Sequence, residues 1–170
     1  MPMRKLKCAA LAAVIGAIWP AIALAEVKVN FIDPERYTDA NLRQRYGRSA
    51  NEPAMREIET YLWRLGEAYL QPGDKLTIDV LDVDLAGRFE PWQFNYRDVR
   101  FMRQFTWPSI KVRYRLERGS AVSQVVEETV ADRGYLTFLT TRDYSNIMPY
   151  EKVMLERWFW FRFVQRRPPA

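Results

Sequence analysis

The sequence has no histidine and only one cysteine, Cys8. Without histidine, neither a Ser-His-Asp nor a Cys-His catalytic arrangement can form, and a zinc site built from histidine or cysteine lacks its ligands. One cysteine cannot make an intramolecular disulfide, so packing alone must hold the fold. We therefore expect no cofactor. The side chains left for chemistry are carboxylates, lysine, tyrosine, serine and threonine.

The first 25 residues have the features of a secretory signal peptide. Three basic residues before position 8 precede an apolar run over 8–24, and an Ala-x-Ala cleavage pattern ends at Ala25. The alternative is a transmembrane anchor, because the run is near the minimum length that spans a membrane. Pro20 and the Ala-x-Ala pattern favour cleavage. We predict a periplasmic or secreted protein that keeps no transmembrane anchor.

Cleavage after Ala25 divides the chain into a signal peptide, 1–25, a single α+β domain, 26–165, and a disordered tail, 166–170. The domain is long enough to bury a core of its own. The full chain has a net charge of +5, and removing the three basic residues of the signal peptide leaves +2. So small an excess of positive charge argues against a nucleic-acid partner.

The clearest pattern in the chain lies between Leu76 and Gly87. Apolar residues alternate with polar ones up to Val80, and the alternation resumes from Leu81 in the opposite phase. A period of two is typical of a strand with one buried face, and a slip of one residue turns the side chains to the other face. We therefore predict a strand with a β-bulge or a bend near Val80 and Leu81.

The other segments complete an α+β fold. The spacing of apolar residues predicts a helix over 52–70, and a second helix, apolar on most sides, is predicted over 150–164. The stretch 92–106 fits a strand, a helix or a loop. We expect a mainly antiparallel sheet of four to six strands, covered on one face by the two helices; a β-sandwich with helical caps is the alternative. Besides the strand described above, alternation predicts strands over 26–32, 110–116 and 122–130, with a hairpin turn at 118–120.

Four stretches of the sequence, in this order behind a signal peptide, resemble one known family. They are VKVNFIDPERYTD (27–39), LTIDVLDVDLAGRFEP (76–91), WPSIKVRYRL (107–116) and YEKVMLERWF (150–159). Together they resemble the bacterial secreted family labelled domain of unknown function 3016. The resemblance covers nearly the whole mature chain and implies an exported protein of proteobacterial type with no assigned activity. It supplies no catalytic residues.

The acids Asp82 and Asp84 are spaced like the first ligands of a calcium-binding loop. Such a loop needs further ligands at its fifth and twelfth positions, which hold Ala86 and Gln93 here, so an EF-hand is excluded. Two interpretations remain. Asp82, Asp84 and Glu90 form a looser metal-binding group, or these acids lie at a strand end and pair with arginines. The second is favoured, and no metal is expected.

The predicted strand 110–116 carries a row of basic residues on one side, including Arg113 and Arg115. This row is a candidate surface for binding a polyanion such as a nucleic acid or a glycan. In an antiparallel sheet the same arginines lie across from Thr77 and Asp79, where opposite charges stabilise the strand pair modestly. We favour this paired, solvated face and keep both arginines as candidate binding residues.

The aromatic residues near the C-terminus are too many for one helical stripe. On a helix that turns about 100° per residue, Met154, Trp158 and Phe161 share one face. Our hypothesis is that Trp158 packs into the core, whereas Trp160 or Phe163 belongs to a contact surface for a partner or a membrane interface.

Two classes of function agree with these features. The first is a non-catalytic envelope protein that binds a protein or glycan partner or assembles with itself. The second is a carboxylate-dependent hydrolase, assisted by a metal or not, that uses Asp82, Asp84 and Glu90. The first is favoured because the chain lacks histidine, and cysteine once the signal peptide is removed, and contains no complete catalytic motif.

Overall fold

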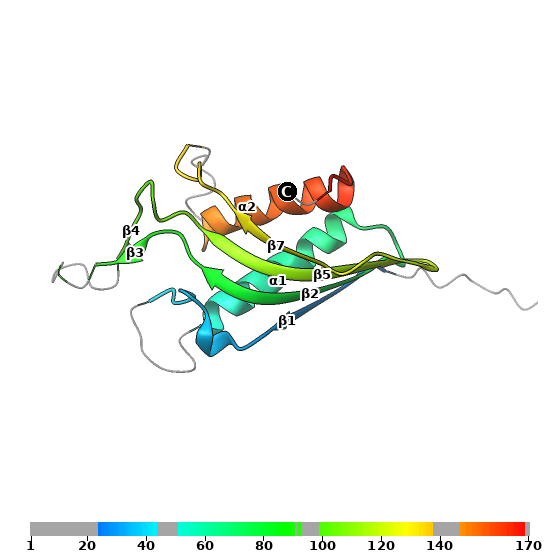
Figure 1. Cartoon of the computed structure of the whole chain (residues 1–170), viewed down its shortest axis with the longest axis horizontal. Helices are drawn as coiled ribbons and strands as arrows, with labels where there is room; N and C mark the ends of the chain where they lie inside the picture. Colours follow the sequence, from blue (N-terminus) through cyan, green and yellow to red (C-terminus); the bar gives the residue numbers. More distant parts are fainter. Residues whose placement is uncertain (1–23, 44–50, 91, 93–98, 138–146, 169–170) are drawn as a thin grey trace, which may run out of the picture.

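The computed structural model describes residues 24–43, 51–90, 92, 99–137 and 147–168 of the chain. Over these residues it is an α+β protein, as the sequence predicts (Figure 1). The elements in chain order are β1 (Glu26–Phe31), the 3-10 turn η1 (Pro34–Arg36), α1 (Glu52–Tyr69), β2 (Lys75–Asp84), β3 (Arg88–Phe89), β4 (Arg100–Phe101), β5 (Ser109–Arg118), β6 (Ala121–Val122), β7 (Val126–Ala131), α2 (Pro149–Phe159) and the π-helical turn η4 (Trp160–Val164).

The main sheet is open and mixed. Its strands run in the order β1-β2-β5-β6, and β7 pairs with β5 as well. Strands β1 and β2 are parallel, while β5 is antiparallel to each of its partners. Parallel neighbouring strands need a long crossover connection. The connection from β1 to β2 contains α1. The short strands β3 and β4 form a separate antiparallel pair, which extends beyond one end of the sheet (Figure 1).

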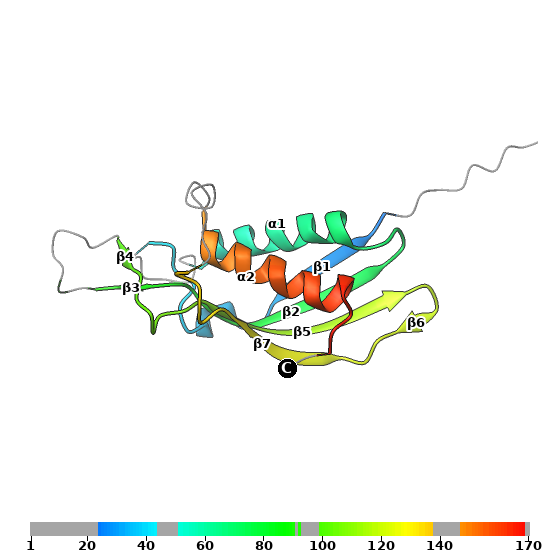
Figure 2. The ribbon, with the colours of Figure 1, turned by 90° about the horizontal axis from the view of Figure 1, so that it is seen from above.

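Both helices cover the same face of the sheet, so the molecule has two layers rather than the two stacked sheets of a β-sandwich (Figure 2). Helix α1 contacts β1, and α2 contacts β7 and α1. The fit of α1 on β1 is close at Gly66, because a Cβ atom there would lie 2.1 Å from Val27 Cγ2. The absence of a side chain at Gly66 therefore lets the helix lie directly on the edge strand.

The phase slip in β2 is a β-bulge, as predicted. Val80 pairs with Val112 and Asp82 pairs with Lys111, so Leu81 is the extra residue in the ladder. Val80 and Val83 on either side of the bulge are both fully buried. The bulge therefore keeps both halves of this ten-residue strand in contact with the core.

The C-terminal helix supplies much of the core. Trp158 is buried, as expected, and its indole Nε1–H donates to Glu128 Oε1 at 2.9 Å. Arg162 and the hydroxyl of Tyr114 also donate to the Glu128 carboxylate. Burial alone would raise the pKa of Glu128, but these hydrogen bonds outweigh it and hold the pKa below its usual value.

The expectation that Phe163 belongs to a contact surface is wrong. Its side chain is only 6% exposed and packs against Phe159 with ring centroids 4.6 Å apart. The helix changes to a wider π turn after Phe159, with the Gln165 amide donating to the Trp160 carbonyl. Phe163 follows Phe159 by four residues and so lies on the same side of the helix, where it continues the buried stripe, while Phe161 is only half-buried.

The sequence did not decide between strand, helix and loop for residues 92–106. Within this stretch, residues 93–98 lie outside the described residues. Of the remainder, Arg100 and Phe101 form β4 and Ser109 begins β5. Within the described ranges, neither helix has the length and apolar character needed to cross a membrane.

Candidate binding surfaces

The face of the main sheet opposite the helices is polar. Every second residue of β1, β2, β5 and β7 is directed to this side, because successive side chains of a strand point to opposite faces. We call it the open sheet face. Its members are Lys28, Asn30, Thr77, Asp79, Lys111, Arg113, Arg115, Glu127 and Thr129.

The charges of the open sheet face are organised as cross-strand pairs. Thr77 lies opposite Arg115 and Asp79 lies opposite Arg113, in the register expected from the sequence. Arg113 Nη2 is 2.9 Å from Asp79 Oδ2, and Lys111 Nζ is 2.7 Å from a Glu127 oxygen. These pairs are partly exposed to solvent, so each adds little stability.

Asp79 is the most constrained charge on the open sheet face. Besides Arg113, it accepts a hydrogen bond of 2.8 Å from Asn30 Nδ2. Burial raises the pKa of this carboxyl, but the hydrogen bonds from Asn30 and Arg113 outweigh burial, so the pKa lies below its usual value. Asp79 therefore stays ionised and holds the Arg113 guanidinium in place.

A shallow hollow of ≈ 190 Å³ lies beside this pair. Donors and acceptors from arginine, aspartate and threonine converge there with the aliphatic side chain of Val125, whereas the ring of Tyr114 lies on the helical side of the sheet against Trp158. This combination suits the hydroxyl or charged groups of a polar ligand, with some apolar contact. The lining residues are Thr77, Asp79, Arg113, Tyr114, Arg115 and Val125.

Trp160 lies apart from the open sheet face, on the helical layer. Its side chain is 39% exposed, and its ring packs edge-on against Tyr69 with centroids 5.6 Å apart. Its neighbours Phe159 and Trp158 are buried. Trp160 is therefore available for contact in a way that the other large aromatics of this helix are not.

The three acids considered for a metal site have separate partners. Asp82 accepts hydrogen bonds from the amide and hydroxyl of Thr38, at 2.7 and 2.8 Å. Asp84 pairs with Arg88, and Glu90 is buried against Arg103. Burial raises the pKa of Asp84 although Arg88 opposes this. Within the described part of the chain, no three acids, cysteines or histidines are grouped closely enough to hold a metal ion.

Sequence reasoning missed the polar centre around Arg100. Its guanidinium, on β4, donates to the Asp39 carboxylate at 2.8 Å. It also donates to four backbone carbonyls, those of Asn41, Leu85, Ala86 and Gly87. The partners lie up to 61 residues away in the chain, and no local pattern marks them. This arginine joins β4, the end of β2 and the loop after β1, which makes it a structural centre.

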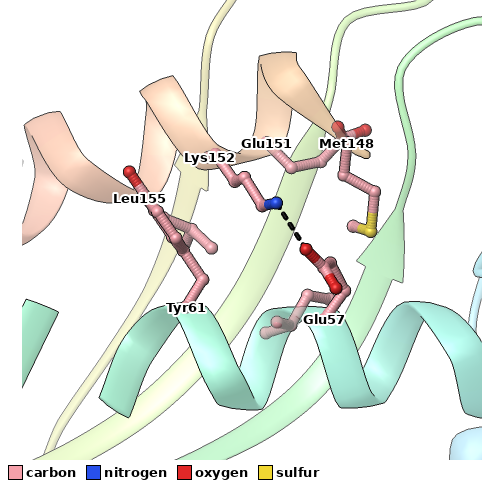
Figure 3. Close-up of a pocket in the computed structure, with 7 residues that line it drawn as sticks. Glu57, Tyr61, Met148, Glu151, Lys152 and Leu155 are labelled. Carbon is pink, nitrogen blue, oxygen red and sulfur yellow. Dashed lines mark hydrogen bonds and ion pairs between the residues drawn. The ribbon is translucent and has the colours of Figure 1, made fainter. Parts of the chain in front are cut away.

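Glu151 is a buried acid that the sequence did not reveal. It lies in the first turn of α2, is 3% exposed, and accepts the amide N–H of Ala86 at 2.7 Å. Burial raises its pKa. The next residue, Lys152, forms an ion pair with Glu57 of α1 (Figure 3). The side chains around this ion pair leave no room for a ligand, so the gap between the helices is not a binding cavity.

Two helices on one face of an open mixed sheet, with a polar face that no described helix or strand covers, define a two-layer α+β protein. The chain belongs to the family described as Protein of unknown function (DUF3016), which it matches over residues 25–160. This confirms the resemblance drawn from the four sequence stretches. No curated protein and no solved structure matches the chain.

Proposed function

We propose that the chain is exported to the cell envelope, is cut after Ala25, and acts there as a non-catalytic binding or assembly module. The open sheet face is the observation that carries the proposal. It presents charged and hydrogen-bonding groups from four strands on a rigid support, beside a hollow. Rigid sheets position side chains more accurately than loops do. The expected partner is a protein or a glycan of the envelope.

Arg113 and Arg115 are proposed as the principal contacts on this face. Each is held by an acid, Asp79 and Glu117, at 2.9 Å. An arginine in such a pair presents its remaining N–H groups in a fixed direction, which suits carboxylates and sugar hydroxyls. The alternative function, a carboxylate-dependent hydrolase, receives no support from the separate partners of Asp82, Asp84 and Glu90.

Export is tested by the mass of the protein in its producing cell. We expect the intact mass of the periplasmic or secreted protein to correspond to a chain that begins at Glu26, because a signal peptidase cuts after the Ala-x-Ala pattern. Replacing Ala25 with a bulky residue should leave the precursor uncut. Full-length protein in the membrane fraction of cells that make the unaltered chain would contradict export with cleavage.

Binding at the open sheet face is tested by a photo-crosslinking amino acid placed at Thr77. We expect adducts to a protein, seen as a discrete band, or to a glycan, seen as a smear. Combining it with Arg113→Ala and Arg115→Ala should reduce the adducts at least about tenfold, since each lost charge-assisted hydrogen bond weakens binding by roughly 1.5–3 kcal/mol.

The matched control places the same crosslinker at Arg64, an exposed position on α1. Adducts at Arg64 should be few and should not change with the double substitution. Equal labelling at both positions, or labelling at Thr77 that survives the loss of both arginines, would show that the open sheet face is not the binding surface.

A further inference from the structure

Strand β1 has one edge that none of the described strands covers. In the part of the chain that the structure describes, its sole strand partner is β2. The amides of Glu26 and Ile32 donate to Asp74 and Val80, on the β2 side. Because N–H groups alternate in direction along a strand, Val27, Val29 and Phe31 direct their backbone groups away from β2. Such an edge is a template for another strand.

A hollow of ≈ 230 Å³ lies along this edge, under helix α1. It is lined by Val27 and Val29 of the strand and by Glu59, Thr60 and Trp63 of the helix. Trp63 is 48% exposed although it is one of the largest apolar side chains of α1. The backbone groups of this edge and the hollow, which is lined by both apolar and polar side chains, together have the features of a site for β-strand addition.

We propose that a second copy of this chain occupies the edge, with its β1 antiparallel to the first and Val29 on the two-fold axis. An added strand must place apolar side chains toward the helices and polar ones on the other face. Strand β1 itself has this alternation, and its own edge is equally free. One symmetric contact therefore pairs both edges and covers Trp63 in both copies.

Charge and length favour this register. With Val29 on the axis, Val27 lies opposite Phe31 of the other copy, Lys28 lies opposite Asn30, and the whole of β1 takes part. An axis at Lys28 would place two lysines opposite each other, which is destabilising. An axis at Val27 would pair Glu26 with Lys28 but would leave Phe31 without a strand beside it.

The dimer goes beyond the proposed function and does not depend on it, because it uses the sheet edge rather than the open sheet face.

The dimer is tested by sedimentation equilibrium of the protein purified from its producing cell. We expect twice the monomer mass for the unaltered protein. Val29→Pro and Trp63→Glu should each give the monomer. Proline at 29 removes an N–H that β2 does not use, and glutamate at 63 places a charge in the contact.

Folding of each variant is checked by cooperative unfolding, and Trp63→Glu decides the test if Val29→Pro does not fold. Val122→Glu, at an exposed apolar position on β6 away from the β1 edge and from the hollow, is the control and should stay dimeric. Val29→Cys in a Cys8→Ser background should form a disulfide across the axis, because Cα atoms of directly paired residues are about 5.5 Å apart.

A monomeric unaltered protein would overturn the dimer, as would a dimer that both edge variants leave intact. A monomer that binds a strand from a different protein at this edge would overturn the choice of occupant. None of these results alters the crosslinking at Thr77 or the mass after export, so failure of the dimer and failure of the proposed function can be distinguished.

Discussion

Replacing Trp158 with alanine is expected to lower the free energy of unfolding by about 3–5 kcal/mol. The indole is 6% exposed, packs edge-on against Tyr114 and Phe163, and donates to Glu128. Its removal leaves a cavity and takes a hydrogen bond from the half-buried carboxylate of Glu128. Denaturant unfolding of the purified protein, with midpoint and slope compared to the unaltered chain, measures the loss.

Trp160→Ala is the matched control, because it removes the same side chain two positions along. Because 39% of the Trp160 side chain is exposed, its replacement should lower the free energy of unfolding much less than Trp158→Ala does. If it belongs to a contact surface, as we propose, its loss should reduce partner capture or shift the particle size seen by light scattering. Equal destabilisation by the two substitutions, with association unchanged, would place Trp160 in the core and remove it from the candidate contacts.

Arg100→Met is expected to destabilise the protein by about 3–5 kcal/mol, the loss typical of removing one partner from a buried ion pair. The Arg100 side chain is 10% exposed and that of Asp39 is 15% exposed. Methionine fills similar space but removes the donor to the Ala86 carbonyl and the closer cationic partner of Asp39, while Arg88 still donates to the carbonyls of Leu85 and Gly87. Denaturant unfolding should show the loss.

The control for Arg100 is Arg88→Met in the same polar region. Arg88 pairs with Asp84 at 2.7 Å, but its side chain is 39% exposed, so water can replace its contacts and the expected loss is about 1 kcal/mol or less. If Arg88→Met lowers the free energy of unfolding as much as Arg100→Met, the burial of the arginine does not determine the size of the loss. A neutral Arg100→Met would contradict its role as a structural centre.

The strands and the bulge could be predicted because their signal is local. Strand β2 must bury alternate residues, so its period and the slip at Leu81 are visible in the sequence itself. The cross-strand pair of Asp79 and Arg113 followed from that register and the opposite charges. The parallel direction of β1 could not be seen, because alternation is the same for strands of either direction.

The polar centre could not be predicted for physical reasons. Arg100 finds its acceptors among residues that only the folded chain brings together, and Glu151 carries no mark of its burial. Phe163 was misplaced because the face of Met154, Trp158 and Phe161 was taken as the buried one. The buried stripe instead runs through Phe159 to Phe163, four residues later on the same side of the helix.

The position of α2 in the chain has a consequence for the timing of folding. Tyr114 and Glu128 come from the sheet, but their polar groups meet Trp158 and Arg162 only when the last helix docks. During synthesis from the N-terminus, the core therefore cannot be completed until nearly the whole chain, including α2, has been made. Such a delay keeps the polypeptide open during synthesis, which is the state in which a chain can be threaded through a narrow channel.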